Sequence, residues 1–181
     1  MPLPFYLESA EVRCGNSTLF RPIAGNLYSD PQDFTVDDDA GEVNFWSISI
    51  PANAMVNYGD RLHVCAYGAV GNTARTRVVK LYFGTVTILT ITNTAASEAW
   101  WFDVNIFKDA ANGGNSIRAG GFQFNTSVGV AAVQLASNNL TLSSAQTLKT
   151  TANNTVGGGG SVWTKQYEAL CDFIGRGNLT P

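Results

Sequence analysis

The sequence predicts an all-β protein whose body is a single sandwich of short strands. Apolar and polar residues alternate in short runs along positions 43–174, which is the period of a strand with one buried face. Glycine, asparagine, serine and proline separate these runs, as turn residues separate the strands of sandwiches and barrels. The chain has 181 residues, 45% hydrophobic and 14% charged, which suits one domain with a substantial core.

Residues 1–42 are predicted to form an extended arm in front of this body. Four prolines punctuate the stretch, and one short strand is expected at 17–23. The arm has eight acids and two bases, a net charge of −6, whereas residues 43–181 have six acids and nine bases, a net charge of +3. An acidic run of Asp37, Asp38 and Asp39 closes the arm. This acidic arm is either a solvated leader or a segment that docks on a basic partner surface.

About nine strands are expected in the body, residues 43–181. The clearest is 99–107, where Trp100 and the alternate residues after it are apolar. A tight turn is expected at Gly84, and a bulge or a close backbone approach at the Gly120–Gly121 pair. The spacing is typical of a sandwich or jelly roll rather than of βαβ units. The expected strands cover residues 43–50, 61–67, 76–83, 86–91, 99–107, 117–124, 128–135, 146–152 and 162–174.

Three aromatic residues are predicted to point away from the core of their strands. Successive residues of a strand point to opposite faces of the sheet. If Trp100 and Trp46 point inward, Trp101 and Phe45 must therefore point outward, and Phe107 lies on the same side of its strand as Trp101. Exposed large aromatics need a cover, so we expect these residues at an interface with the arm or another subunit. The alternative is a second sheet that buries the same face within the molecule.

The chemistry-bearing residues form no catalytic cluster in the sequence. His63 is the one histidine, and we expect a structural or interfacial role for it rather than a part in a catalytic triad. Asp103 and Glu168 are isolated acids, although carboxylate pairs can form across strands. The acidic residues of the arm lack the order of a calcium loop. We therefore expect no enzyme activity, no cofactor and no metal site.

Composition also limits the partners and the compartment. Cys65 and Cys171 lie in apolar strand patterns, where small buried side chains are the rule, and three cysteines do not make a disulfide framework. Synthesis in a reducing cytoplasm fits this usage. No apolar run approaches the ~20 residues of a membrane span, and no concentrated basic patch suggests nucleic acid.

Three segments of the body resemble the jelly-roll domains of tailed-bacteriophage structural proteins. Residues 50–54 read Ile-Pro-Ala-Asn-Ala, residues 59–64 read Gly-Asp-Arg-Leu-His-Val, and residues 66–73 read Ala-Tyr-Gly-Ala-Val-Gly-Asn-Thr. The strand at 100–106 and the Ala-Gln-Thr-Leu at 145–148 stand where that pattern has its later strands. The resemblance covers roughly residues 43–174.

The resemblance implies a jelly-roll sandwich in a non-enzymatic virion protein, usually a homotrimer. The first hypothesis is a capsid decoration (cement) protein that binds the major capsid protein on the outside of a phage head and stabilises the shell. The second is a head-fibre or tail protein that recognises host surface glycan, because exposed tryptophan and tyrosine can stack on sugars. A β-sandwich glycan hydrolase or lyase and other structural or lectin-like modules are further alternatives.

Overall fold

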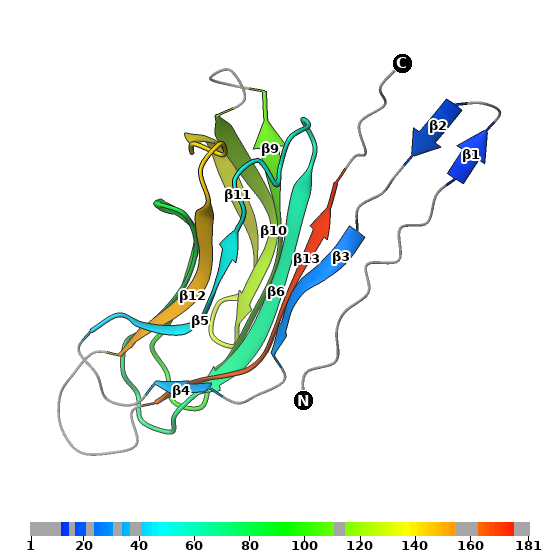
Figure 1. The fold of residues 1–181 in the computed structure, drawn as a ribbon. Helices are drawn as coiled ribbons and strands as arrows, with labels where there is room; N and C mark the ends of the chain where they lie inside the picture. The colour runs from blue at the N-terminus through cyan, green and yellow to red at the C-terminus, as the bar shows by residue number, and fades with distance from the viewer. Residues whose placement is uncertain are drawn as a thin grey trace, which may run out of the picture.

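The computed structural model describes residues 12–14, 17–20, 24–30, 34–36, 41–110, 115–154 and 163–175, and in these ranges every regular element is a strand. Two antiparallel sheets form a sandwich, which confirms the predicted fold class (Figure 1). A two-stranded hairpin of β1 (Val12–Cys14) and β2 (Ser17–Phe20) precedes them. In the same ranges no helix has the length and hydropathy to cross a membrane.

The large sheet has seven strands in the order β11-β10-β9-β6-β13-β3, and β4 pairs with β13 beside this path. Its pairings are antiparallel throughout. Its strands are β3 (Ala24–Asp30), β4 (Phe34–Val36), β6 (Arg61–Val70), β9 (Ala99–Asp109), β10 (Ser116–Asn125), β11 (Gly129–Asn139) and β13 (Thr164–Ile174).

The small sheet has four antiparallel strands in the order β5-β12-β7-β8. The chain passes from one sheet to the other between β4 and β5, β5 and β6, β6 and β7, β8 and β9, β11 and β12, and β12 and β13, which gives the sandwich its jelly-roll-like course. The β7–β8 hairpin and the β9–β10–β11 meander each stay within one sheet. The strands are β5 (Val43–Ile50), β7 (Arg77–Phe83), β8 (Val86–Asn93) and β12 (Gln146–Asn154).

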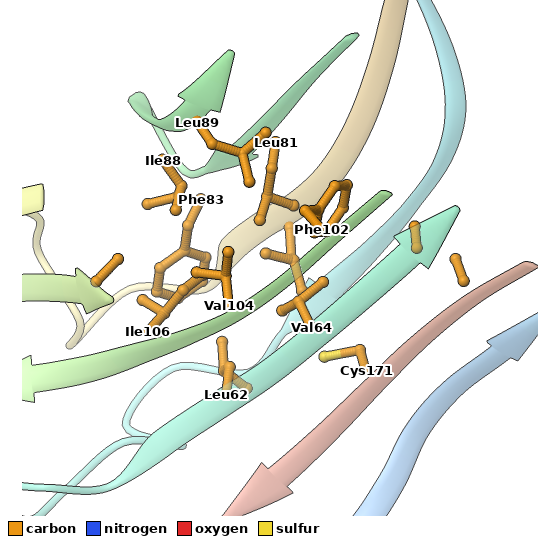
Figure 2. Close-up of a cluster of buried hydrophobic side chains, with 14 of the residues drawn as sticks. Leu62, Val64, Leu81, Phe83, Ile88, Leu89, Phe102, Val104, Ile106 and Cys171 are labelled. Atoms are coloured by element: carbon orange, nitrogen blue, oxygen red, sulfur yellow. The ribbon is translucent and has the colours of Figure 1, made fainter. Parts of the chain in front are cut away.

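The hydrophobic core lies between the two sheets (Figure 2). Val64 of β6 and Ile106 of β9 approach Leu81 and Phe83 of β7, and all four side chains are fully buried. Burying one such side chain contributes about 1.5–3 kcal/mol. The predicted alternation is confirmed on β9, where Trp100, Phe102, Val104 and Ile106 all point into the core.

Two segments of the predicted arm are strands of the large sheet. β3 pairs with β13 along Ala24–Asp30, and β4 pairs with Thr164–Gln166. Asn154 of β12 donates to the carbonyl oxygen of Val36 at 2.8 Å and accepts from the Thr164 hydroxyl at 2.6 Å. These bonds join β4 to both sheets. The division of the chain at residue 42 stays a prediction, and Asp37, Asp38 and Asp39 lie outside the described residues.

Two of the predicted glycine roles have a clear steric basis. Gly84 has φ +59° in the turn between β7 and β8, a conformation that side chains rarely adopt. A Cβ on Gly121 would collide with the carbonyl oxygen of Asp103 on β9, whereas one on Gly120 would meet nothing nearer than 4.0 Å. The pair therefore marks a close backbone approach, and Gly121 alone makes it.

The residues that carry the family resemblance have structural roles in the loop between β5 and β6. Asn53 has φ 57°, and its backbone N–H donates to the carbonyl oxygen of Leu142 at 2.9 Å. Gly59 has φ 88°, and the carboxylate of Asp60 accepts from the backbone N–H of Asn57 at 2.7 Å. Since these features shape a turn, they do not by themselves mark a functional site.

Candidate functional site

A row of large side chains crosses the outer face of the large sheet. Val130, Phe124, Trp101 and Tyr67 are successive register partners on β11, β10, β9 and β6. Tyr167 of β13 extends the row, because its ring centroid lies 5.9 Å from that of Tyr67. Partners across antiparallel strands share one face of a sheet. We call this row of five residues the aromatic band.

The rings of the band contact one another but stay partly open to solvent. Trp101 and Phe124 have centroids 6.0 Å apart and planes within 19°, the spacing of a favourable aromatic pair. Tyr67 is 47% exposed and Val130 62% exposed. Phe122, in the next row of β10, is 56% exposed. A large apolar surface of this kind on a sandwich is typical of a binding face.

The outer face of the small sheet differs sharply in composition. It has one aromatic residue, Tyr82, which lies among polar groups: the Nζ atoms of Lys80 and Lys149 are 5.7 and 5.1 Å from its ring centroid. Glu42 accepts hydrogen bonds from Lys80 at 3.0 Å and Tyr82 at 3.2 Å. The other exposed or half-buried side chains of this face are Asn44, Ser47, Ser49, Val78, Thr87, Thr90, Thr92, Thr147 and Asn153, and Val78 is the one apolar residue among them.

A shallow hollow of about 470 Å³ opens beside the middle of the band. Tyr67 and Trp101 line it together with the apolar side chain of Leu170, and Asp103 and Glu168 supply carboxylates. The hollow therefore combines ring faces with hydrogen-bond acceptors. A second hollow of about 700 Å³ lies over β9, β10 and β11, where Phe107 and Arg118 line it.

His63 lies on this face one row away from the hollow. Its Nε2 donates to the Asp103 carboxylate at 2.9 Å, and its Nδ1 is 3.8 Å from the Asp172 carboxylate. The strand pairing brings both acids to His63. Asp172 on β13 is its direct register partner, and Asp103 on β9 lies two residues before its other register partner, Asn105. His63 therefore links β6 to both β9 and β13 by polar contacts.

The nearest thiol is not activated by this pair. Burial, with the negative charges of Asp103, Asp172 and Glu168, raises the pKa of Cys65 to about 11. A nucleophilic cysteine needs the opposite shift, because the thiolate is the reactive form. Among the described residues no group of three or more histidine, cysteine or acidic side chains is placed to hold a metal ion.

Of the three aromatic residues that were predicted to face outward, two do so and one is buried in the core. Trp101 and Phe107 do lie half-buried on the outer face of the large sheet. The prediction for Phe45 is wrong: this side chain is 3% exposed and stacks on Trp100 with centroids 6.1 Å apart. The register on β12 passes from Thr150, opposite Trp46, to Thr151, opposite Asn44, so Phe45 is the extra residue of a bulge. Phe45 and Trp46 can therefore both be buried.

The sequence contained signals for residues that the prediction did not select. Tyr67 and Phe124 occupy alternate positions opposite the buried residues of their strands, which is the same signal that identified Trp101. Asp103 was considered only as a carboxylate, and its contact with His63 depends on the pairing of β6 with β9. The strand order is thus what assembles the band.

Comparisons with known proteins add likenesses of shape only. No protein-family model matches the chain, and no curated protein matches it significantly. Among solved structures, it is similar to a CBM2 module of the evolved Dit of Lactobacillus casei BL23 phage J-1, at TM-score 0.35 and 10% identity over 71% of this chain and 68% of that one. The chain is also similar to peanut lectin, at TM-score 0.36 and 5% identity over 84% of this chain and 97% of that one.

The infectious bursal disease virus VP2 subviral particle gives TM-score 0.35 and 12% identity over 99% of this chain. The chain spans 38% of the length of that VP2 protein. All three TM-scores are below 0.5. The fold of the chain is therefore defined by its own strand pairing rather than by these likenesses.

Proposed function

We propose that the protein is a non-enzymatic virion structural protein that decorates the exterior of a phage capsid. In this proposal the outer face of the large sheet docks on the major capsid protein, with the aromatic band at the centre of the contact. The observation that carries the proposal is the contrast between the two outer faces. One presents Trp101, Tyr67 and Phe124, and the other presents serine, threonine and lysine.

The residue types of the band suit a protein–protein contact. Tryptophan and tyrosine are enriched at the centres of interfaces, where they supply large buried area with few rotatable bonds. Asp103 and Glu168 lie beside the band and can pair with basic groups at its rim. The resemblance of residues 50–73 to phage jelly-roll proteins supports the virion assignment. Many such contacts on one particle would act together.

The docking role is tested on capsids that have been assembled without the protein. Wild type, Tyr67→Ser and Trp101→Ser are added, and occupancy is measured by density-gradient sedimentation and gel densitometry. Tyr82→Ser, on the outer face of the small sheet, is the matched control. We expect Tyr67→Ser and Trp101→Ser to weaken binding at least about tenfold, and the control to bind as wild type does. Equal occupancy for all four proteins would contradict docking through the band.

The acidic run of the arm is proposed as a second contact with the capsid. Deleting residues 1–42 would remove β3 and β4 from the large sheet, so the test must keep the chain intact. Asp37→Asn, Asp38→Asn and Asp39→Asn in one variant remove only charge. We expect this variant to bind capsids more weakly at low salt, and salt to reduce the difference. Identical salt curves would rule out electrostatic docking by the run.

Recognition of host glycan is a second candidate function, and the hollow between Tyr67 and Trp101 favours it. Aromatic rings pack against the C–H faces of sugars, and the carboxylates of Asp103 and Glu168 can accept hydrogen bonds from hydroxyl groups. Asp103→Asn with Glu168→Gln should abolish binding to host-cell polysaccharide if this function holds. Capsid binding without any polysaccharide binding would leave decoration as the function.

A further inference from the structure

One edge of the large sheet is formed by β11, a strand without the charges and prolines that usually protect an edge. β11 pairs with β10 on one side, and no strand of the described ranges pairs with its other side. An edge strand presents unpaired backbone N–H and C=O groups to other chains. Proteins usually protect such edges with charges, prolines or bulges. β11 has no charged residue and no proline along Gly129–Asn139.

The exposed side chains of this edge are apolar as well. Val128, just before the strand, is 74% exposed, and Val130 and Ala132 are exposed on the outer face. The pairing with β10 is regular from Gly129 to Leu135 and breaks only at Ala136 and Ser137, where two residues oppose Arg118. Seven residues of regular, uncharged backbone are thus available for pairing.

The edges of the small sheet are different. The outward residues of β8 are Thr87, Thr90 and Thr92, and those of β5 are Asn44, Ser47 and Ser49. At the opposite edge of the large sheet lies β3, whose side chains are outside the described residues. Among the edges with described side chains, β11 is the one that exposes apolar groups.

We propose that β11 pairs with β11 of a second copy of this chain, antiparallel and around a two-fold axis. Self-pairing sets the residue at the two-fold axis against its own copy, so a charge near the middle of the strand would face its own like or lie near it. The absence of charge from Gly129–Asn139 removes this repulsion and makes the strand complementary to itself. A two-fold contact of this kind is closed and does not grow into fibres.

The regular stretch places the two-fold axis at its middle residue, Ala132. Ala132 then faces its own copy, and Val130 faces Gln134 of the second copy. Phe122 is the register partner of Ala132 on β10, so the outer faces of the two sheets become continuous. The two aromatic bands then lie on one continuous outer face, on either side of the two-fold axis, which doubles the docking area. This assembly is a dimer, in place of the trimer that the family resemblance implies.

The mass of the full-length protein in solution tests the pairing. Sedimentation velocity and native mass spectrometry at micromolar concentrations are expected to give a dimer for wild type. Ala132→Lys and Ala132→Glu, each alone, place like charges opposite each other and are expected to give monomers. An equimolar mixture of the two is expected to give a heterodimer. Thr90→Lys, on the edge strand of the small sheet, is the matched control and should remain dimeric.

Several results would overturn the proposal. A monomeric or trimeric wild type would do so, and so would Ala132→Lys that stays dimeric. Failure of the mixture to associate, while each variant shows a cooperative thermal transition like that of the control, would also do so. Ala132→Cys gives a second measurement, because facing residues lie within the Cα separation of a disulfide. Mild oxidation should cross-link this variant into dimers and leave wild type uncross-linked.

Discussion

Tyr67 of β6 and Trp101 of β9 are direct cross-strand partners on the outer face of the large sheet, and both line the same hollow. Each ring has a further aromatic neighbour on its other side, Tyr167 for Tyr67 and Phe124 for Trp101. The inner face of the same strands is a conventional core. The sheet therefore has one face that stabilises the fold and one that is available to a partner.

Adjacent tryptophans on β9 allow these two roles to be separated. Trp100 is 1% exposed between Phe45 and Phe102, so Trp100→Ala should destabilise the protein by about 3–5 kcal/mol. Trp101→Ala removes the pair with Phe124, which contributes about 0.5–1.5 kcal/mol beyond the area that Trp101 buries, and should cost less than Trp100→Ala because Trp101 stays partly exposed. Urea unfolding followed by circular dichroism measures both. Equal losses would mean that the outer face is as important to folding as the core.

The glycine pair on β10 offers a second matched comparison. Gly121→Ala would push a methyl group into the Asp103 carbonyl and the backbone of Val104, so we expect a large loss of stability or of soluble protein. Gly120→Ala has room for the methyl group and should stay within about 1 kcal/mol of wild type. Thermal denaturation of the two variants checks this. Similar transition temperatures would show that β10 can move away from β9 at little cost.

Strand positions were predictable because alternation is local information. The strand predicted at 43–50 is observed at Val43–Ile50, and the one predicted at 61–67 begins at Arg61 and continues to Val70. Phe45 was mispredicted because its burial depends on a bulge against β12, about a hundred residues further along the chain. No pattern within β5 encodes that bulge.

The site was predictable only in part, for the same reason. Trp101 could be assigned to an outward position from its own strand. The band, however, needs five strands in a particular order, and strand order is a property of the whole chain. The pairing of His63 with Asp103 joins residues 40 positions apart. Likewise, the addition of β3 and β4 to the sheet depends on β13, near the other end of the sequence.

Cys65 and Cys171 are expected to be protected while the protein is folded. Burial raises the pKa of Cys171 to about 12, and burial together with nearby carboxylates raises that of Cys65 to about 11. Because only the thiolate reacts, both should alkylate far more slowly at pH 8 than a free cysteine does. Iodoacetamide labelling of a Cys14→Ser variant, followed by mass spectrometry, measures this. Labelling should become fast in denaturant, and fast labelling in native buffer would contradict the described burial.

Glu42 should give the small sheet a pH-dependent contribution to stability. Burial alone would raise the pKa of Glu42, but hydrogen bonds from Lys80, Thr151 and Tyr82 and the charge of Lys80 outweigh it, so the pKa is lowered from 4.5. A lowered pKa means that the stabilisation is present above pH 4.5 and is lost as the pH falls through the folded-state value. The pKa of Lys80 is raised from 10.5, mainly by its hydrogen bond to Glu42, so its contribution is present below pH 10.5 and is lost as the pH rises through the folded-state value.

Glu42→Gln should therefore be less stable than wild type between these two limits, by no more than about 1 kcal/mol because the pair is near the surface. Below the folded-state pKa of Glu42 the two proteins should become equally stable, since both side chains are then neutral. Urea midpoints measured from acidic to alkaline pH test this difference. A gap that stays constant into strong acid would show that Glu42 stabilises the sheet through its hydrogen bonds and not through its charge.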